Sequence, residues 1–190
     1  MTLQLFKWMM ALAVMLYLPL LFEHVRGIRL IDRKHSDEYI KNRVESIYFD
    51  VTHFYNQLDA LRHGETATTL PEGEWPDFDR LYCSDAWNAQ VAAVLQSEEH
   101  SAPEGGFFTR NYWIGGSEIE FLYINKVEVI DRTGDQATVS LTLHNGDNAI
   151  PVLLVMLFER DDWQIDNMTY YWNEKPSPRY YDWRQEMELQ

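Results

Sequence analysis

The period of the hydrophobic pattern changes near residue 107, and this change limits the possible folds more than any single motif does. Before it, apolar residues recur at steps of three and four, as they do on one face of an α-helix. After it, apolar and polar residues alternate, as they do in a β-strand with one buried face. Helices followed by a run of strands are typical of α+β domains. We therefore expect an α+β fold in which helices pack on a curved antiparallel sheet.

One long amphipathic helix is predicted over residues 37–62. Ser36 can cap its first turn, and the two acids that follow suit the positive end of the helix dipole. Gly64 marks its end. Its apolar stripe consists of Ile40, Val44, Ile47, Val51, Phe54, Leu58 and Leu61, widened by Tyr48 and Tyr55. A stripe this wide needs a large apolar surface, which a sheet further along the chain can provide.

A second helical region is predicted over residues 78–96, and Cys83-Ser84-Asp85 can divide it into two pieces. The expected apolar face consists of Leu81, Trp87, Val91, Val94 and Leu95. Cys83 is the one cysteine in the sequence, which excludes an intramolecular disulfide and a zinc site built from several thiolates. Its apolar neighbours predict a half-buried side chain that packs as a small apolar residue.

Four strands of an antiparallel meander are predicted after the helices, at residues 121–131, 137–144, 149–160 and 163–172. Asn145-Gly146 is a strong hairpin signal, because both residues accept a positive φ. Asp161-Asp162 is expected to form the next tight turn. The third strand is apolar on both faces, which places it in the middle of the sheet. After Pro178 the chain is expected to continue as an aromatic, partly helical tail.

Residues 1–27 are predicted to be a signal peptide or an N-terminal membrane anchor, which leaves residues 28–190 as a single domain. Residues 8–22 carry no charge, and such a run belongs in a bilayer or a translocon. About fifteen residues suit a signal-peptide core, whereas residues 3–22 would make a short anchor. Basic residues after the run argue mildly against simple export. We expect a periplasmic or extracytoplasmic protein, secreted or anchored in the inner membrane.

The sequence is strongly acidic, with 30 Asp and Glu against 16 Lys and Arg and a net charge of −14. Such a field repels phosphate backbones, so nucleic acid is not an expected partner. It suits a solvated surface or a basic protein partner. Large apolar groups are abundant, at 46% hydrophobic residues, so a packed core is expected.

The closing pair of strands carries a family resemblance. A long apolar strand, 153–160, is followed by the acidic turn Asp161-Asp162 and by Trp163-Gln164-Ile165-Asp166. Together with the long helix, the helical pair and the meander, this pattern resembles the nuclear transport factor 2-like superfamily over residues 36–172. Within that superfamily the chain looks like small exported bacterial domains of unassigned function.

The resemblance implies a cone-shaped half-barrel whose sheet wraps the long helix and leaves a cavity at the wide end. The superfamily contains enzymes such as ketosteroid isomerase and scytalone dehydratase. It also contains interaction modules, among them periplasmic domains of secretion-system assembly proteins and several bacterial immunity proteins. The fold therefore does not decide the function.

No motif for catalysis, metal binding or cofactor binding accompanies the resemblance. A cavity enzyme of this kind needs a His or Asp base, with a Tyr, Asp or Asn to hold developing negative charge. No His stands at a spacing that pairs it with a carboxylate, and neither HExxH nor HxH occurs. Phosphate-cradling glycine motifs and a nucleophile elbow are also missing. We therefore predict no catalytic residue, no metal and no cofactor, and these observations weigh against an enzyme.

Aromatic residues give the better functional signal, because they cluster just before the sheet and at its end. The candidates for ligand or partner binding are Tyr112, Trp113, His144, Asp166, Tyr170 and Trp172. Core filling is the plain alternative, but rings also anchor interfaces, and an acidic body would steer a basic partner towards them. We expect a non-enzymatic domain that acts through protein–protein contact, such as a secretion-envelope component or an immunity-type protein.

The alternative is a small-molecule binder, or a lyase- or isomerase-type enzyme, that uses the cone cavity with Tyr112, Asp166 or His144 as its polar groups. An open pocket with a carboxylate or a His beside a Tyr would favour this alternative. In a regular strand Trp163 and Ile165 would face the core. Asp166 would then either point outward or close a bulge with Asn167.

Overall fold

The computed structural model describes residues 33–64, 76–101, 111–116, 118–172, 179–182 and 187. The chain divides into two compact units, residues 1–39 and 40–190, and the fold below is that of the second unit. The predicted signal or anchor, residues 1–27, lies outside the described residues, so its role stays a prediction. In the part of the chain that is described, no helix is long and apolar enough to span a membrane.

Helix α2, Asp37–Arg62, has the predicted bounds. Its first turn is capped by Ser36, whose Oγ accepts a hydrogen bond from the Tyr39 N–H at 3.2 Å. Gly64 follows the helix with φ of +69°, the left-handed conformation found at many helix ends. The buried stripe is Ile40, Val44, Ile47, Tyr48, Val51, Tyr55 and Leu58.

Helices α3, Phe78–Tyr82, and α4, Asp85–Ser101, form the predicted pair. The predicted break between them is confirmed, because Cys83 has extended backbone angles of φ −100° and ψ 158°. Asp77 caps α3 by accepting a hydrogen bond from the Arg80 N–H at 3.0 Å.

The predicted apolar face of this pair is only partly correct. Trp87 and Val94 are buried, but Leu81 and Leu95 are 53% and 49% exposed. The extended residue at Cys83 turns α4 relative to α3, so the two helices do not share one continuous face. Each contributes its own buried residues, and one leucine of each remains on the surface.

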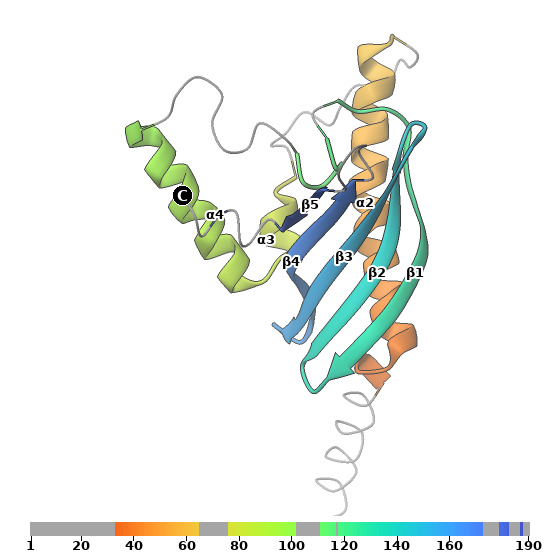
Figure 1. Ribbon diagram of the computed structural model, residues 1–190, viewed down its shortest axis with the longest axis vertical. Helices are drawn as coiled ribbons and strands as arrows, with labels where there is room; N and C mark the ends of the chain where they lie inside the picture. Colours follow the sequence, from red (N-terminus) through yellow and green to blue (C-terminus); the bar gives the residue numbers. More distant parts are fainter. Residues whose placement is uncertain are drawn as a thin grey trace, which may run out of the picture. The chain divides into compact units, whose positions relative to one another are not determined.

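The sheet is a meander of order β1-β2-β3-β4-β5 with antiparallel neighbours (Figure 1). Its strands are β1 Leu122–Thr133, β2 Gln136–Asn145, β3 Asn148–Glu159, β4 Asp162–Trp172 and β5 Arg179–Asp182. The α+β class, the four-strand meander and the central position of β3 are confirmed. The helical character predicted after Pro178 is wrong for residues 179–182, because this segment returns antiparallel along β4 and pairs with Thr169–Trp172.

Two tight turns differ in detail from the predicted ones. The β2–β3 turn consists of Gly146-Asp147, with φ of +58° at Gly146, and Asn145 is the last residue of β2. The β3–β4 turn consists of Arg160-Asp161, which have φ of 52° and 63°, rather than of Asp161-Asp162. Asn145 is therefore not a turn residue. Its side chain connects β2 to the segment before β1, because its Nδ2 donates to the carbonyls of residues 114 and 118 at 3.2 and 2.9 Å.

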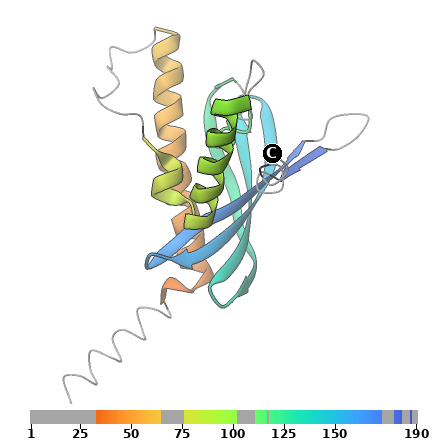
Figure 2. The same cartoon turned by 90° about the vertical axis from the view of Figure 1, so that its left-hand side faces the viewer.

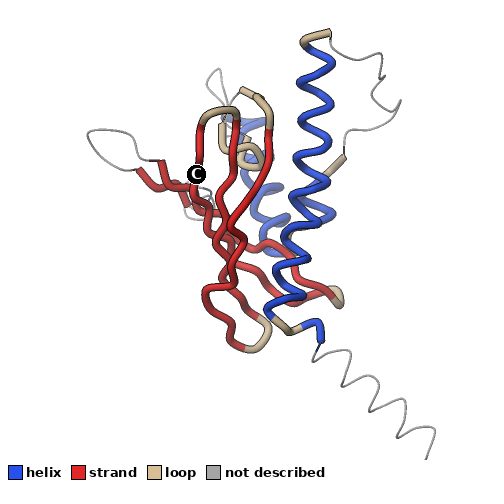
Figure 3. The backbone as a smooth tube through the Cα atoms, turned by 90° about the vertical axis from the view of Figure 1, so that its right-hand side faces the viewer, coloured by secondary structure: helices blue, strands red, loops and turns tan. Residues whose placement is uncertain are grey.

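The main core lies between α2 and one face of the sheet, which run side by side in Figure 3. On β2, Val139, Leu141 and Leu143 are buried and the residues between them are half-buried, as the alternation predicts. Helices α3 and α4 lie on the side of β4 (Figures 1 and 2), where the Ser84 N–H donates to the Ile165 carbonyl at 2.8 Å.

Asn56 attaches the edge of the sheet to α2. Its Nδ2 donates to the Leu122 carbonyl at 2.8 Å, and its Oδ1 accepts a hydrogen bond from the Leu122 N–H at 2.7 Å. One side-chain amide thus takes the place that a neighbouring strand would have at this residue. It satisfies both backbone groups that β1 turns away from β2.

Asn56→Ala should lower the free energy of unfolding by about 1–3 kcal/mol, because it leaves the N–H and carbonyl of Leu122 without these partners. Chemical denaturation of the full chain would measure the change. Asn125→Ala removes an exposed amide from the same strand and should change stability by less than about 0.5 kcal/mol. Equal effects of the two substitutions would show that the Asn56 pairing does not support the fold.

Candidate functional site

A pocket of about 300 Å³ opens where α2, α3 and the turn at residues 111–116 meet. Its lining is mainly aromatic and acidic, and consists of Tyr55, Pro76, Asp77, Phe78, Asp79, Asn111, Tyr112 and Trp113. We call it the Asp79 pocket. Phe78 is buried and packs between Tyr55 and Trp113, with ring centroids 6.1 and 5.8 Å away. The aromatic walls are therefore fixed by packing in the core.

Asp79 lines this pocket from the first turn of α3. Its Oδ2 accepts a hydrogen bond from the hydroxyl of Tyr112, and its Oδ1 accepts one from Nε1 of Trp113 at 2.9 Å. The thiol of Cys83 approaches the same Oδ1 at 4.0 Å. Both carboxylate oxygens thus accept hydrogen bonds, which fix the orientation of the carboxylate group.

Burial raises the pKa of Asp79 above its ordinary value. The hydrogen bonds from Tyr112 and Trp113 lower that pKa, and the nearby charge of Asp77 raises it further. The buried Trp87 indole has the smallest effect on this pKa, and among the described residues its N–H has no partner in hydrogen-bonding geometry. Burial, followed by the charge of Asp79, also raises the pKa of Tyr112. The Tyr112 hydroxyl therefore stays protonated and remains a donor to the carboxylate.

The far wall of the pocket is the turn at residues 111–116. The Asn111 Nδ2 donates to the Tyr55 hydroxyl at 2.6 Å, and its Oδ1 accepts a hydrogen bond from the Trp113 N–H at 2.9 Å. Gly115 has φ of +67°, and a Cβ there would lie 2.9 Å from Cδ1 of Ile150. Only glycine fits this turn against the sheet without a shift of the neighbouring side chains.

The structure brings two of the six predicted binding residues together in this pocket, Tyr112 and Trp113. Tyr170 is fully buried and supports the turn from the sheet, because its hydroxyl donates to the Tyr112 carbonyl. His144 does not line the pocket; its ring stacks on Tyr123 across β1 and β2, with centroids 4.3 Å apart. The side chain of Trp172 lies outside the described residues, although its backbone pairs with β5.

Asp166 forms the bulge that was one of its two predicted roles, and it does not point outward. Val155 pairs with Asn167 and Met156 pairs with Ile165, so Asp166 is an extra residue in β4. The extra residue reverses the alternation, which is why Met168 and Tyr170 join Trp163 and Ile165 among the fully buried residues. In a regular strand Asn167 would share the face of Trp163 and Ile165, and the bulge moves it off that face.

The bulge directs the Asp166 carboxylate to the junction of α3 and α4. Its Oδ1 accepts a hydrogen bond from the Ser84 hydroxyl at 2.6 Å, and both residues are buried. The Ser84 Oγ in turn accepts a hydrogen bond from the Trp87 N–H at 2.9 Å, which caps α4. Asp166 therefore fixes a helix start and does not belong to the pocket.

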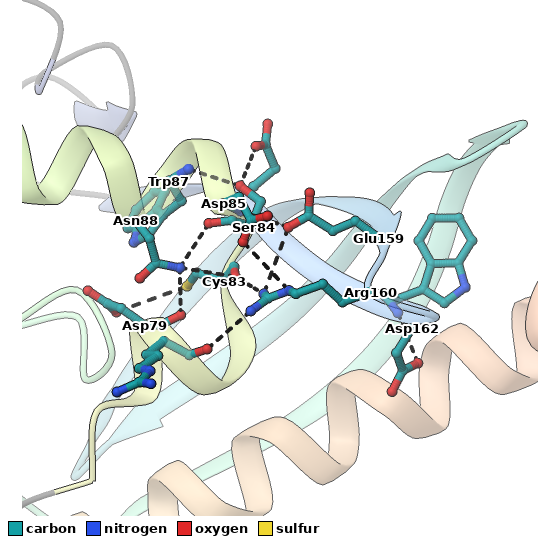
Figure 4. A network of polar contacts seen from close by, with 12 residues as sticks. Asp79, Cys83, Ser84, Asp85, Trp87, Asn88, Glu159, Arg160 and Asp162 are labelled. Atoms are coloured by element: carbon teal, nitrogen blue, oxygen red, sulfur yellow. Dashed lines mark hydrogen bonds and ion pairs between the residues drawn. The ribbon is translucent and has the colours of Figure 1, made fainter.

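Arg160, in the β3–β4 turn, fixes the end of α3 (Figure 4). Its guanidinium donates to the carbonyls of Cys83 and Arg80, which lie at the negative end of that helix. Its Nε lies 3.7 Å from a carboxylate oxygen of Asp85, and its Nη2 lies 3.8 Å from one of Glu159. The turn and the bulge together position the helix that carries Asp79.

The described residues include no group of three or more His, Cys, Asp or Glu that could hold a metal ion. Cys83 is fully buried rather than half-buried, and burial raises the pKa of its thiol well above the ordinary value. A thiol in this state is a poor nucleophile, in agreement with the predicted packing role.

Asp79, Tyr55 and Asn111 are not among the site residues that the sequence predicts. Asp79 looks like one more acid in the first turn of a helix, where acids are common. The signals in the sequence are its neighbour Phe78 and the aromatic residues at 112 and 113. Only the fold brings residues 79 and 112 together.

Asp166→Ala should lower the free energy of unfolding by about 1.5–3 kcal/mol, because it removes a buried charged acceptor from Ser84. It should also speed hydrogen exchange of the Trp87 amide, whose capping oxygen loses its support. Asp147→Ala, in the exposed β2–β3 turn, is the matched control and should leave both quantities nearly unchanged. An unchanged Trp87 exchange rate in Asp166→Ala would contradict the positioning role.

No protein-family model matches the sequence, and no curated protein matches it. Among solved structures, a chain in the crystal structure of the type VI native effector–immunity complex Tae3–Tai3 from Ralstonia pickettii is similar, with a TM-score of 0.38 and 16% identity. The match covers 68% of this chain and 94% of that chain. At this TM-score the likeness supports no conclusion about function. The α+β meander is established by the strands themselves, and the nuclear transport factor 2-like assignment stays a prediction.

Proposed function

We propose that residues 40–190 form a non-enzymatic domain that binds a basic protein partner, and that the Asp79 pocket takes a cationic group of that partner. The observation that carries this proposal is the carboxylate of Asp79, held by two donors inside an aromatic pocket. Its negative charge has a fixed place, and aromatic side chains, which attract cations, line the pocket around it.

The same hydrogen bonds argue against proton transfer as the main role of Asp79. A general base must have an oxygen within hydrogen-bonding reach of the substrate proton. Here Tyr112 and Trp113 already occupy both oxygens of the carboxylate. A held carboxylate can still attract a cation through its charge, which needs no free lone pair.

The charge of the whole chain supports a basic partner. A net charge of −14 would steer a cationic protein towards the domain and speed its association. Among the described residues neither Asp77 nor Asp79 forms an ion pair, so their charges are available to a ligand. Tyr55, Tyr112 and Trp113 are of the residue types that dominate binding energy at interfaces.

We further propose that the domain acts outside the cytoplasm, secreted or held at the inner membrane by the apolar segment within residues 1–27. The support for this is the uncharged run at residues 8–22. A member of the nuclear transport factor 2-like superfamily in this location would suit a secretion-envelope component or an immunity-type protein.

One observation favours the alternative of a small-molecule binder or a lyase- or isomerase-type enzyme. The pocket is open and holds a carboxylate of raised pKa beside two tyrosines, which is the arrangement expected of an acid–base site. The two functions differ in the role of the Tyr112 hydroxyl. In an enzyme Tyr112→Phe would abolish turnover, whereas in a binding domain it would weaken binding only moderately.

Removal of charge from the pocket should release the partner. Asp77→Asn keeps the cap of α3, because Asn caps as well as Asp, while Asp79→Asn keeps the shape of the central side chain. Each should weaken partner binding by about tenfold or more, as expected for the loss of a charge-assisted contact. Affinity capture of cross-linked complexes by the full chain, compared between variants by quantitative mass spectrometry, would measure this.

Asp131→Asn, an exposed substitution on β1, is the matched control and should retain the partner. Binding should also weaken on acidification, because protonation removes the Asp79 charge. The raised pKa places that loss at a higher pH than for an ordinary aspartate. A partner retained equally by Asp79→Asn and Asp131→Asn would contradict the proposal.

The proposed location has a separate test. A reporter that is active only outside the cytoplasm, fused after Gly27, should be active if residues 1–27 direct export. Deletion of residues 8–22 is the control, and it should abolish the reporter signal. Equal reporter activity with and without residues 8–22 would overturn the proposed location.

A further inference from the structure

We propose that the partner segment extends from the Asp79 pocket across α3 onto α4, and that it carries an apolar side chain close to its basic residue. This inference rests on the proposed function and adds the chemistry of the partner. It follows from a second concavity, which we call the α4 groove. The groove is lined by Asp77, Asp79, Arg80, Asp85, Asn88, Val91, Ala92, Leu95 and Arg160.

The α4 groove and the Asp79 pocket share two residues, Asp77 and Asp79. The groove has a volume of about 620 Å³, about twice that of the pocket. Because the two carboxylates line both concavities, a chain that places a cation at Asp79 would lie next to the groove. The two concavities therefore offer one binding surface with the acids at its centre.

The far side of the groove is apolar. Val91 and Leu95 lie one helical turn apart on α4, and Ala92 lies beside them. The sequence places Val91 and Leu95 on the same predicted face as the buried Trp87 and Val94, yet Leu95 is 49% exposed. An apolar residue of the partner would bury this leucine, and that burial is the favourable contribution that the groove adds.

Asp77 and Asp79 are the groups in the groove that would attract a cationic ligand. Arg160 is already engaged by the carbonyls of α3 and by the carboxylates of Asp85 and Glu159. Arg80 is the other cation of the lining, and it would repel a basic segment. The expected ligand is thus cationic next to Asp77 and Asp79 and apolar next to Leu95.

The groove is also rigid, because hydrogen bonds fix the angle between α3 and α4. The Asn88 Nδ2 donates to the carbonyls of Asp79, Cys83 and Ser84 at 3.0, 3.2 and 2.9 Å. These bonds join the two helices in addition to the Ser84–Asp166 bond and the Arg160 contacts. A surface that is formed before binding loses little entropy when the partner arrives.

Synthetic peptides that differ at two positions would test this inference. The four combinations are Arg with Leu, Arg with Ser, Glu with Leu, and Glu with Ser, each at several spacings in an otherwise Gly/Ser sequence. Fluorescence anisotropy would measure binding to the full chain in detergent micelles. We expect the Arg–Leu peptide to bind at least about fivefold more tightly than Arg–Ser at one spacing, and the Glu peptides not to bind.

Two leucines of similar exposure provide matched variants, since Leu95 lies in the groove and Leu81 lies outside it. Leu95→Ala should remove the preference for Arg–Leu over Arg–Ser, whereas Leu81→Ala should keep it. Arg80→Gln should tighten binding of both Arg peptides.

The outcomes separate this inference from the proposed function. Equal binding of Arg–Leu and Arg–Ser, weakened by Asp79→Asn but not by Leu95→Ala, would overturn the inference and leave the cation site intact. Loss of the Arg preference itself, or no binding of any peptide, would overturn both.

Discussion

The extra residue in β4 determines where the helical pair lies, and the candidate site depends on that pair. As the bulged residue, Asp166 turns a carboxylate towards the edge of the sheet, where it accepts the Ser84 hydroxyl. Ser84 also donates its N–H to the Ile165 carbonyl and caps α4. Because α3 ends at this junction, the same contacts set the position of Asp79 on its first turn. A bulge that would be a defect in a regular sheet here connects the sheet to the pocket.

The groups that form the pocket also hold the fold together. Tyr112 donates to Asp79 through its hydroxyl, while its carbonyl accepts the hydroxyl of the buried Tyr170. The turn at residues 111–116 is thus tied to α3 on one side and to β4 on the other. A ligand at Asp79 would therefore meet a preformed surface. This favours recognition over a mechanism that needs the carboxylate to change its partners during a reaction.

The sequence predicts the parts of the fold that depend on local pattern. The helix at residues 37–62 and the four strands follow from periodicity, caps and turn residues, and all are confirmed. The bulge at Asp166 was foreseen only as one of two alternatives, because an inserted residue leaves no mark on a short alternating run. The sequence predicts part of the candidate site. Tyr112 and Trp113 are binding candidates because aromatic rings anchor interfaces, but Asp79 is not among the candidates. Its role depends on a contact between residues 33 positions apart in sequence, which no local pattern encodes.

The half-buried carboxylate of Asp79 opposes folding wherever it is ionised. Burial raises its pKa in the folded chain, so the folded state holds the proton more tightly than the unfolded state does. The stability linked to this group is present below its ordinary pKa and is lost as the pH rises through the raised value. The hydrogen bonds from Tyr112 and Trp113 offset part of this cost of ionisation. A carboxylate whose ionisation costs stability, in an open aromatic pocket, is what the proposed cation site requires. That distinction separates Asp79 from Asp166, whose contacts are accounted for by the helix it holds in place.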